Sequence, residues 1–160
     1  MTEDPQRKIA QEQLLYSMAV TKSRPELPPP TVPPCVLFCD GVILEQGTGK
    51  TTLVGTYSGV TAATFPSPPK DLHIYVQLTS FVGVVDLMLV CTKVDIPEPR
   101  EVYASKHNVR FRGKLVLEQV HFIWNQFQFP DPGEYAFQLW SQGHCLAEHR
   151  LVVRQKGGAQ

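Results

Sequence analysis

Residues 46–52, with the sequence QGTGKTT, have the composition of a phosphate-binding loop. In a P-loop, backbone amides and a lysine hold nucleotide phosphates where a strand leads into a helix. The pattern G-x-x-x-x-G-K-[ST] requires a glycine five residues before Gly49, but that position is Leu44. Residues 52–60 are rich in β-branched residues and glycine, which favour a strand over a helix. We therefore interpret this segment as a hairpin loop and expect no nucleotide binding.

Residues 144–149, with the sequence HCLAEH, contain side chains that bind transition metals. If this segment is a strand, Cys145 and His149 share one face and the other two candidate ligands share the opposite face. The ligands therefore do not converge locally, and a metal site would need His73 or His121 from other strands. We interpret these histidines as scattered surface residues. The alternative is a small enzyme or metal-dependent protein whose His and Cys residues are assembled by the fold.

Five aromatic side chains lie close together in the C-terminal third of the sequence: Phe122, Trp124, Phe127, Phe129 and Trp140. If side chains alternate between the two faces of a strand, some of these rings must point outward. An exposed aromatic patch marks a partner or ligand surface, so these residues are candidates for partner binding. The alternative is that the inner faces of two sheets and an N-terminal arm bury them.

Composition excludes several classes of function. Lysine plus arginine and aspartate plus glutamate number 15 each, so no net charge attracts nucleic acid or anionic lipid. The longest apolar run, residues 81–91, is interrupted by Asp86 and is shorter than the roughly 20 residues of a membrane helix. The N-terminus has acidic residues and lacks the apolar segment of a signal peptide. We expect a cytoplasmic protein with no cofactor, no nucleotide, no nucleic acid and no membrane contact.

The chain divides into four segments: an N-terminal helical arm (1–21), a proline-rich linker (22–34), a β-sandwich domain (35–154) and a disordered tail (155–160). Asp4 and Pro5 are typical of a helix start. Because an isolated helix of about 15 residues is marginally stable in water, the arm should be helical only when docked on this domain or on a second chain.

Seven or eight strands are predicted between residues 35 and 154. They cover 35–44, 51–60, 72–79, 85–92, 114–124, 135–140 and 145–154, with a weaker candidate at 100–111. Apolar and polar residues alternate most clearly in 72–79 and 85–92, which indicates half-buried strands. Residues 80–83 are short enough to join these two strands as a hairpin, and Gln142-Gly143 predicts a second tight turn.

Residues 131–137, with the sequence DPGEYAF, are typical of the penultimate strand of an immunoglobulin-like sandwich. In such domains the tyrosine hydroxyl bonds back to the backbone a few residues upstream and fixes the corner between the sheets. We assign this structural role to Tyr135 and expect Gly133 where side chains are crowded. The predicted fold is an all-β, antiparallel, immunoglobulin-like sandwich.

The four cysteines are interpreted as reduced. In one strand, Cys35 and Cys39 would have Cα atoms about 13 Å apart, too far for a disulfide or one shared metal ion. Cys91 and Cys145 fall at inward-facing positions of other strands and are expected to be buried thiols.

Several motifs together resemble a family of small bacterial proteins of unknown function: LFCD (37–40), TGKTTLVG (48–55), PGEYxFxL (132–139) and LAE (146–148). The resemblance covers residues 35–153 and implies an immunoglobulin-like sandwich, but no substrate, cofactor or catalytic residue. The function we predict is a non-catalytic interaction module that binds a protein partner or forms a homo-oligomer.

Overall fold

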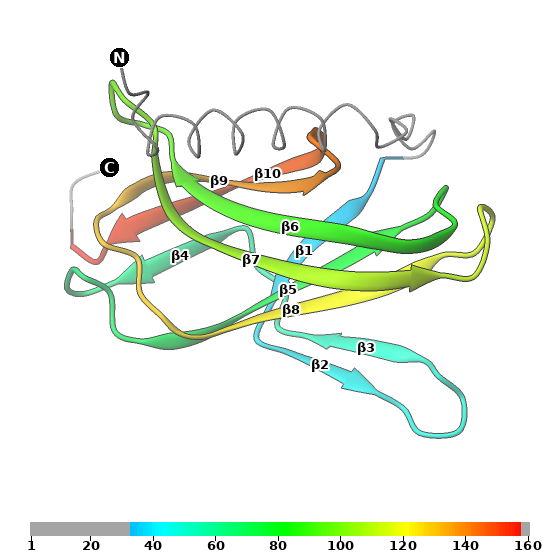
Figure 1. Ribbon diagram of the computed structural model, residues 1–160. Coiled ribbons are helices and arrows are strands. Elements are labelled where there is room, and N and C mark those ends of the chain that lie inside the picture. Colours follow the sequence, from blue (N-terminus) through cyan, green and yellow to red (C-terminus); the bar gives the residue numbers. More distant parts are fainter. Residues whose placement is uncertain (1–32, 158–160) are drawn as a thin grey trace, which may run out of the picture.

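The computed structural model describes residues 33–157 (Figure 1). Within this range the chain forms ten β-strands in three sheets and no helix, which confirms the all-β prediction. The predicted helical arm, most of the linker and residues 158–160 lie outside the described residues. In the described part, no helix has the length and apolarity needed to span a membrane.

The two larger sheets contain three and five strands, and the third sheet is a two-stranded hairpin (Figure 1). The three-stranded sheet has the order β1 (Cys35–Cys39), β5 (Lys70–Leu78), β8 (Glu118–Phe127). The five-stranded sheet has the order β4 (Gly59–Ala62), β10 (His144–Gln155), β9 (Gly133–Ser141), β6 (Gly83–Lys93), β7 (Arg100–Phe111). The hairpin pairs β2 (Gly41–Leu44) with β3 (Thr51–Val54). All pairings are antiparallel except that of β4 with β10, which is parallel.

The strand count is higher than predicted because two predicted strands are each broken in the middle. The first breaks at Asp40, whose amide donates to the carbonyl oxygen of Val54 at 2.8 Å instead of continuing the ladder of β1. The second breaks at Gly55, where φ is +62°, a conformation that glycine adopts without strain. In both cases the two halves join different sheets. At the other end, β10 runs on to Gln155, one residue into the predicted tail.

The predicted hairpin between β5 and β6 is wrong, because these strands belong to different sheets. The connection at residues 80–83 crosses from one sheet to the other. Its Phe81 is buried, with its ring centroid 5.1 Å from that of Phe111, so the crossing chain closes one end of the core. The turn at Gln142-Gly143 is confirmed: both residues have positive φ, and β9 pairs directly with β10.

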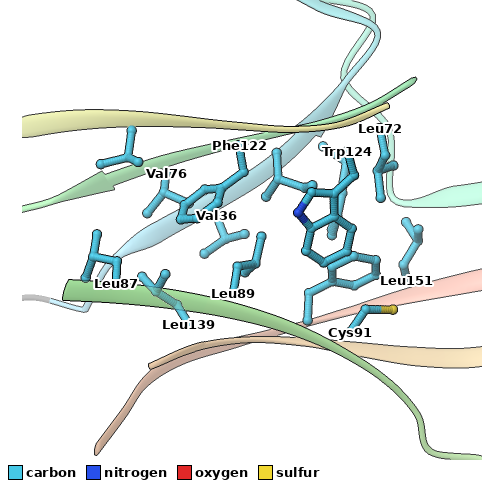
Figure 2. Packing of buried hydrophobic residues seen from close by; sticks show 14 of the residues in the cluster. Val36, Leu72, Val76, Leu87, Leu89, Cys91, Phe122, Trp124, Leu139 and Leu151 are labelled. Carbon is cyan, nitrogen blue, oxygen red and sulfur yellow. The ribbon is translucent and has the colours of Figure 1, made fainter. Parts of the chain in front are cut away.

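The core fills the space between the two larger sheets (Figure 2). The predicted alternation is visible in β5, where Leu72, Ile74, Val76 and Leu78 are all buried. Phe137 of β9 joins the two layers, since its ring centroid lies 4.7 Å from that of Phe38 in β1 and 5.7 Å from that of Trp124 in β8. Each fully buried ring of this kind contributes roughly 2–3 kcal/mol.

Tyr135 makes the hydrogen bond that residues 131–137 predict. Its hydroxyl donates to the carbonyl oxygen of Asp131 at 2.6 Å, and the amide of Asp131 approaches the same hydroxyl at 3.3 Å. The side chain is fully buried, and burial raises the pKa of Tyr135 to about 12. The phenol therefore stays protonated and remains a hydrogen-bond donor at all physiological pH values.

A buried lysine completes this corner. The ammonium group of Lys93 lies 5.2 Å from the ring centroid of Tyr135, pairs with Asp95 at 3.2 Å and donates to the carbonyl oxygen of Pro132 at 2.5 Å. Gly133, with φ of +143°, passes so close that a Cβ atom there would collide with the side chains of Asp95 and Lys93. The crowding expected at Gly133 is therefore confirmed.

Replacing Tyr135 with phenylalanine should destabilise the domain by about 1–2 kcal/mol, because the carbonyl oxygen of Asp131 loses its buried donor. Urea unfolding followed by tryptophan fluorescence measures this change. Tyr103→Phe is the matched control: Tyr103 is 46% exposed, so its loss should stay within about 0.5 kcal/mol. Equal stabilities for the two variants would remove Tyr135 from its corner role.

Candidate functional site

Four of the five candidate partner-binding aromatic residues are part of the core. Phe122, Trp124, Phe127 and Phe129 are all buried, and three of them form a continuous series of ring contacts with Tyr135. The interpretation of these four residues as an exposed patch is therefore wrong.

Phe127 is buried because the chain changes direction near the end of β8. Phe122 and Trp124 are two residues apart and share the inner face, whereas Phe127 should point outward by strict alternation. Gln126 has φ of +53°, and the pairing of β5 with β8 shifts its register between Lys70 and Leu72. This irregularity turns Phe127 inward, and a local shift of this kind has no signature in the sequence.

Trp140 is the member of the group that stays partly accessible. It lies on the outer face of the five-stranded sheet, opposite Met88 of β6, and its Nε1–H donates to the side chain of Gln138 at 3.3 Å. With Met88 and Lys106 it lines a shallow hollow. Trp140 therefore remains a candidate contact residue, separated from the other four by the thickness of the sheet.

The cysteines are placed as expected except for one. All four thiols are free; Cys39 and Cys91 are buried, while Cys35 and Cys145 are exposed. The burial predicted for Cys145 is wrong because β10 has a bulge between Cys145 and Ala147, which removes Cys145 from the inward row. Partial desolvation and the nearby Glu148 raise the pKa of Cys145, so this thiol is not an activated nucleophile.

The loop that resembles a P-loop is a hairpin loop, as predicted. It joins β2 to β3, and the amide of Glu45 donates to the carbonyl oxygen of Lys50 at 2.8 Å across its base. The hydroxyl of Thr48 bonds to the carboxylate of Glu45. No helix follows, so the loop amides do not converge at a helix N-terminus as phosphate binding requires.

The β2–β3 hairpin projects from the body of the domain below β5 and β8 (Figure 1). β2 contacts β5, and the hydroxyl of Thr51 bonds to the side chain of Gln119 in β8 at 2.5 Å. Three large apolar side chains of the hairpin are nevertheless exposed: Ile43 by 57%, Leu44 by 66% and Val54 by 45%. We call these three residues the hairpin patch.

A pocket of about 380 Å³ opens at one end of the domain, between β4 and the start of β5. Its lining is mostly apolar and includes Val60 and Ala62 of β4, Leu72 of β5, and the rings of Phe127 and Phe129. This volume lies at the lower end of the range of ligand pockets. The pocket can hold a small apolar ligand.

The polar groups at the mouth of this pocket already have partners. Lys70 pairs with Asp40 at 2.6 Å and lies 5.3 Å from the ring centroid of Tyr57, while the carboxylate of Asp71 accepts from the amide of Gln126 at 2.9 Å. Burial, with a smaller effect of Asp40, raises the pKa of Tyr57 to about 12, so its phenol is not a base. The charged groups at the pocket mouth are therefore already engaged within the domain.

His73 and His121 are two histidines that the fold brings together. His73 lies on β5 and His121 on β8, and their Nδ1 and Nε2 atoms are 2.9 Å apart. Partial burial lowers the pKa of His121, and the nearby His73 lowers it further. The sequence identified both residues as candidate ligands but could not show that they meet. Across residues 33–157, no group of three or more His, Cys, Asp or Glu side chains is arranged to hold a metal ion.

The comparisons with known proteins identify the family. Residues 34–154 match the model of a family of unknown function, DUF6941, and the chain belongs to this family. The predicted resemblance to a family without a known function is thereby confirmed. No curated protein matches this chain.

Two crystal structures of a beta-glucosidase from Listeria innocua are among the similar solved structures, one of them in complex with glucose. The identities are 11% and 10%, the TM-scores are 0.39 and 0.37, and the matches cover 61% and 62% of this chain. The matched part is 15% of each enzyme chain, so this chain spans a small part of their length. Similarity at this level carries no argument about function.

Acidification should destabilise the domain partly through His121. An unfolded histidine titrates near pH 6.5, and the folded pKa of His121 is lower, so between the two values the unfolded chain binds more protons. The stability that neutral His121 contributes to the folded domain is therefore fully present above about pH 6.5. This stability is lost as the pH falls through the pKa of His121 in the folded domain. In urea unfolding at about pH 7.5 and 5.5, His121→Gln should show a smaller loss of stability than the wild type. His144→Gln is the control. A wild-type pH dependence in both variants would contradict this assignment.

Proposed function

We propose that this chain is a non-catalytic interaction module, with an immunoglobulin-like sandwich fold, that binds a protein partner or a second copy of itself. The observation that carries the proposal is the hairpin patch. A two-stranded hairpin is marginally stable by itself in water, and this one leaves three large apolar side chains accessible. Ile43 and Val54 are neighbours on one exposed face of this projecting element, and exposed apolar patches mark interaction surfaces.

The hairpin offers a partner two kinds of contact. Ile43 and Val54 lie on one face, because they occupy diagonal positions of the β2–β3 ladder, while Leu44 points to the opposite face near the tip. The two strands also have outer edges with no neighbouring strand in the described chain. An extended segment of a partner could pair with such an edge while its side chains cover Ile43 and Val54.

Two observations support the immunoglobulin-like part of the proposal. The last two strands pair with each other, β9 also pairs with β6, and the short β4 runs parallel to β10 at the edge of the same sheet. The Tyr135–Asp131 hydrogen bond lies at the start of the penultimate strand, as in a tyrosine corner. The four free thiols support a reducing compartment, and we propose the cytoplasm.

Ile43→Asp and Val54→Asp should weaken association without unfolding the domain, because both side chains are on the exposed face of the hairpin. Sedimentation velocity measures self-association, and chemical crosslinking in a lysate of the native host detects a partner. Leu115→Asp is the control, because Leu115 is 98% exposed and lies in the loop between β7 and β8, outside the hairpin. Both hairpin variants should weaken association at least about tenfold, equivalent to about 1.4 kcal/mol or more.

The proposal predicts that Leu115→Asp retains the association of the wild type. If the hairpin variants associate as tightly as this control, the hairpin is not the contact. The outer face around Trp140 then becomes the better candidate surface. Circular dichroism of each variant verifies that the sheets are intact.

A further inference from the structure

The histidine pair lies on the face of the three-stranded sheet that points away from the core. In the β5–β8 ladder His73 is opposite Ile123 and His121 is opposite Tyr75, so the two histidines are diagonal neighbours. Their ring centroids are 5.1 Å apart, and the ring planes differ by 24°. Since Nδ1 of His73 and Nε2 of His121 are only 2.9 Å apart, the two rings point nearly at each other. One of these nitrogens carries a proton and donates a hydrogen bond to the other.

The separation of the two nitrogens also suits a metal ion. Metal–imidazole bonds are about 2.0–2.1 Å long, so two nitrogens bound at a right angle to one ion are about 2.9 Å apart. Right angles between neighbouring ligands are characteristic of the tetragonal, nitrogen-rich coordination that Cu²⁺ and Ni²⁺ prefer. A tetrahedral ion needs the nitrogens further apart. The separation of the two nitrogens is therefore closer to that of neighbouring ligands in a tetragonal site than in a tetrahedral one.

We propose that Nδ1 of His73 and Nε2 of His121 form a two-histidine binding site for Cu²⁺ or Ni²⁺, with water in the remaining positions. Binding breaks the N–H···N hydrogen bond. The ring that carried the shared proton takes up its other tautomer, with the proton on its second nitrogen, so both contact nitrogens present a lone pair and no proton is lost overall. The rings turn about their Cβ–Cγ bonds, whose torsion is soft, until both lone pairs meet the ion.

Other histidines in the domain are held differently. The ring of His107 packs against Phe122 with centroids 4.4 Å apart, and the ring of His149 packs against Phe38 at 5.2 Å. Both are thereby directed toward core aromatic residues. His144, at the start of β10, has no histidine beside it in the β9–β10 ladder. The paired geometry is thus specific to β5 and β8.

The test uses the full chain without a histidine tag, carrying Cys35→Ser and Cys145→Ser. These two thiols are exposed and would otherwise bind soft metals and reduce Cu²⁺. Isothermal titration with Ni²⁺ should give one equivalent bound. With Cu²⁺, electron paramagnetic resonance should show coupling to two nitrogen donors. His73→Gln and His121→Gln should each weaken Ni²⁺ binding at least about tenfold. His144→Gln is the matched control and should bind like the parent.

A second measurement does not depend on the variants being folded. In the parent protein, substoichiometric Cu²⁺ should broaden the amide resonances of residues 73 and 121 and their neighbours before those of β10. The proposal is wrong if no Ni²⁺ binds at concentrations up to about 1 mM. It is also wrong if His144→Gln weakens binding as much as His121→Gln does, or if the first resonances to broaden belong to β10. These results do not depend on the hairpin patch, so this site and the proposed interaction function can fail separately.

Discussion

The packing of Phe137 between the two larger sheets is the contact on which the rest of the structure depends. Phe137 is on the central strand β9, and its ring meets Phe38 from one edge of the opposite sheet and Trp124 from the other. Trp124 also donates through Nε1 to the hydroxyl of Ser105 at 2.8 Å, which connects the edge strands β8 and β7. One cluster of rings thus fixes the separation of the layers and closes one side of the domain.

The surfaces with functional potential arise where the chain leaves this packed arrangement. At Asp40 the chain turns out of the three-stranded sheet to form the hairpin, and at Gly55 it returns toward β4. The hairpin patch lies on β2 and β3, and the pocket lies between β4 and β5. The outward-facing His73 lies on β5, and His121 lies on the neighbouring strand β8. The packed core between the two larger sheets is thus the rigid part of the domain, and the segment between β1 and β4 carries accessible side chains.

Local patterns in the sequence predicted local structure well. Alternating residues identified β5 and β6, glycines identified the hairpin loop at residues 46–50, and the DPGEYAF segment predicted the hydrogen bond of Tyr135. Pairing between strands was not predictable in the same way. The crossing after β5, the inward Phe127 and the exposed Cys145 depend on long-range register and on a bulge, which no local pattern encodes. For the same reason, the sequence could name His73 and His121 but could not bring them together.

The parallel pairing of β4 with β10 has a consequence for how the domain folds and opens. Residues 59–62 pair with residues 152–155, so a loop containing most of the described chain must close before these hydrogen bonds form. β4 is four residues long and has β10 as its single neighbour in its sheet. Such a strand joins late in folding and leaves early in local unfolding, because few bonds compensate the entropy of closing the loop. Since Val60 and Ala62 line the pocket between β4 and β5, detachment of this edge strand would remove one wall of that pocket.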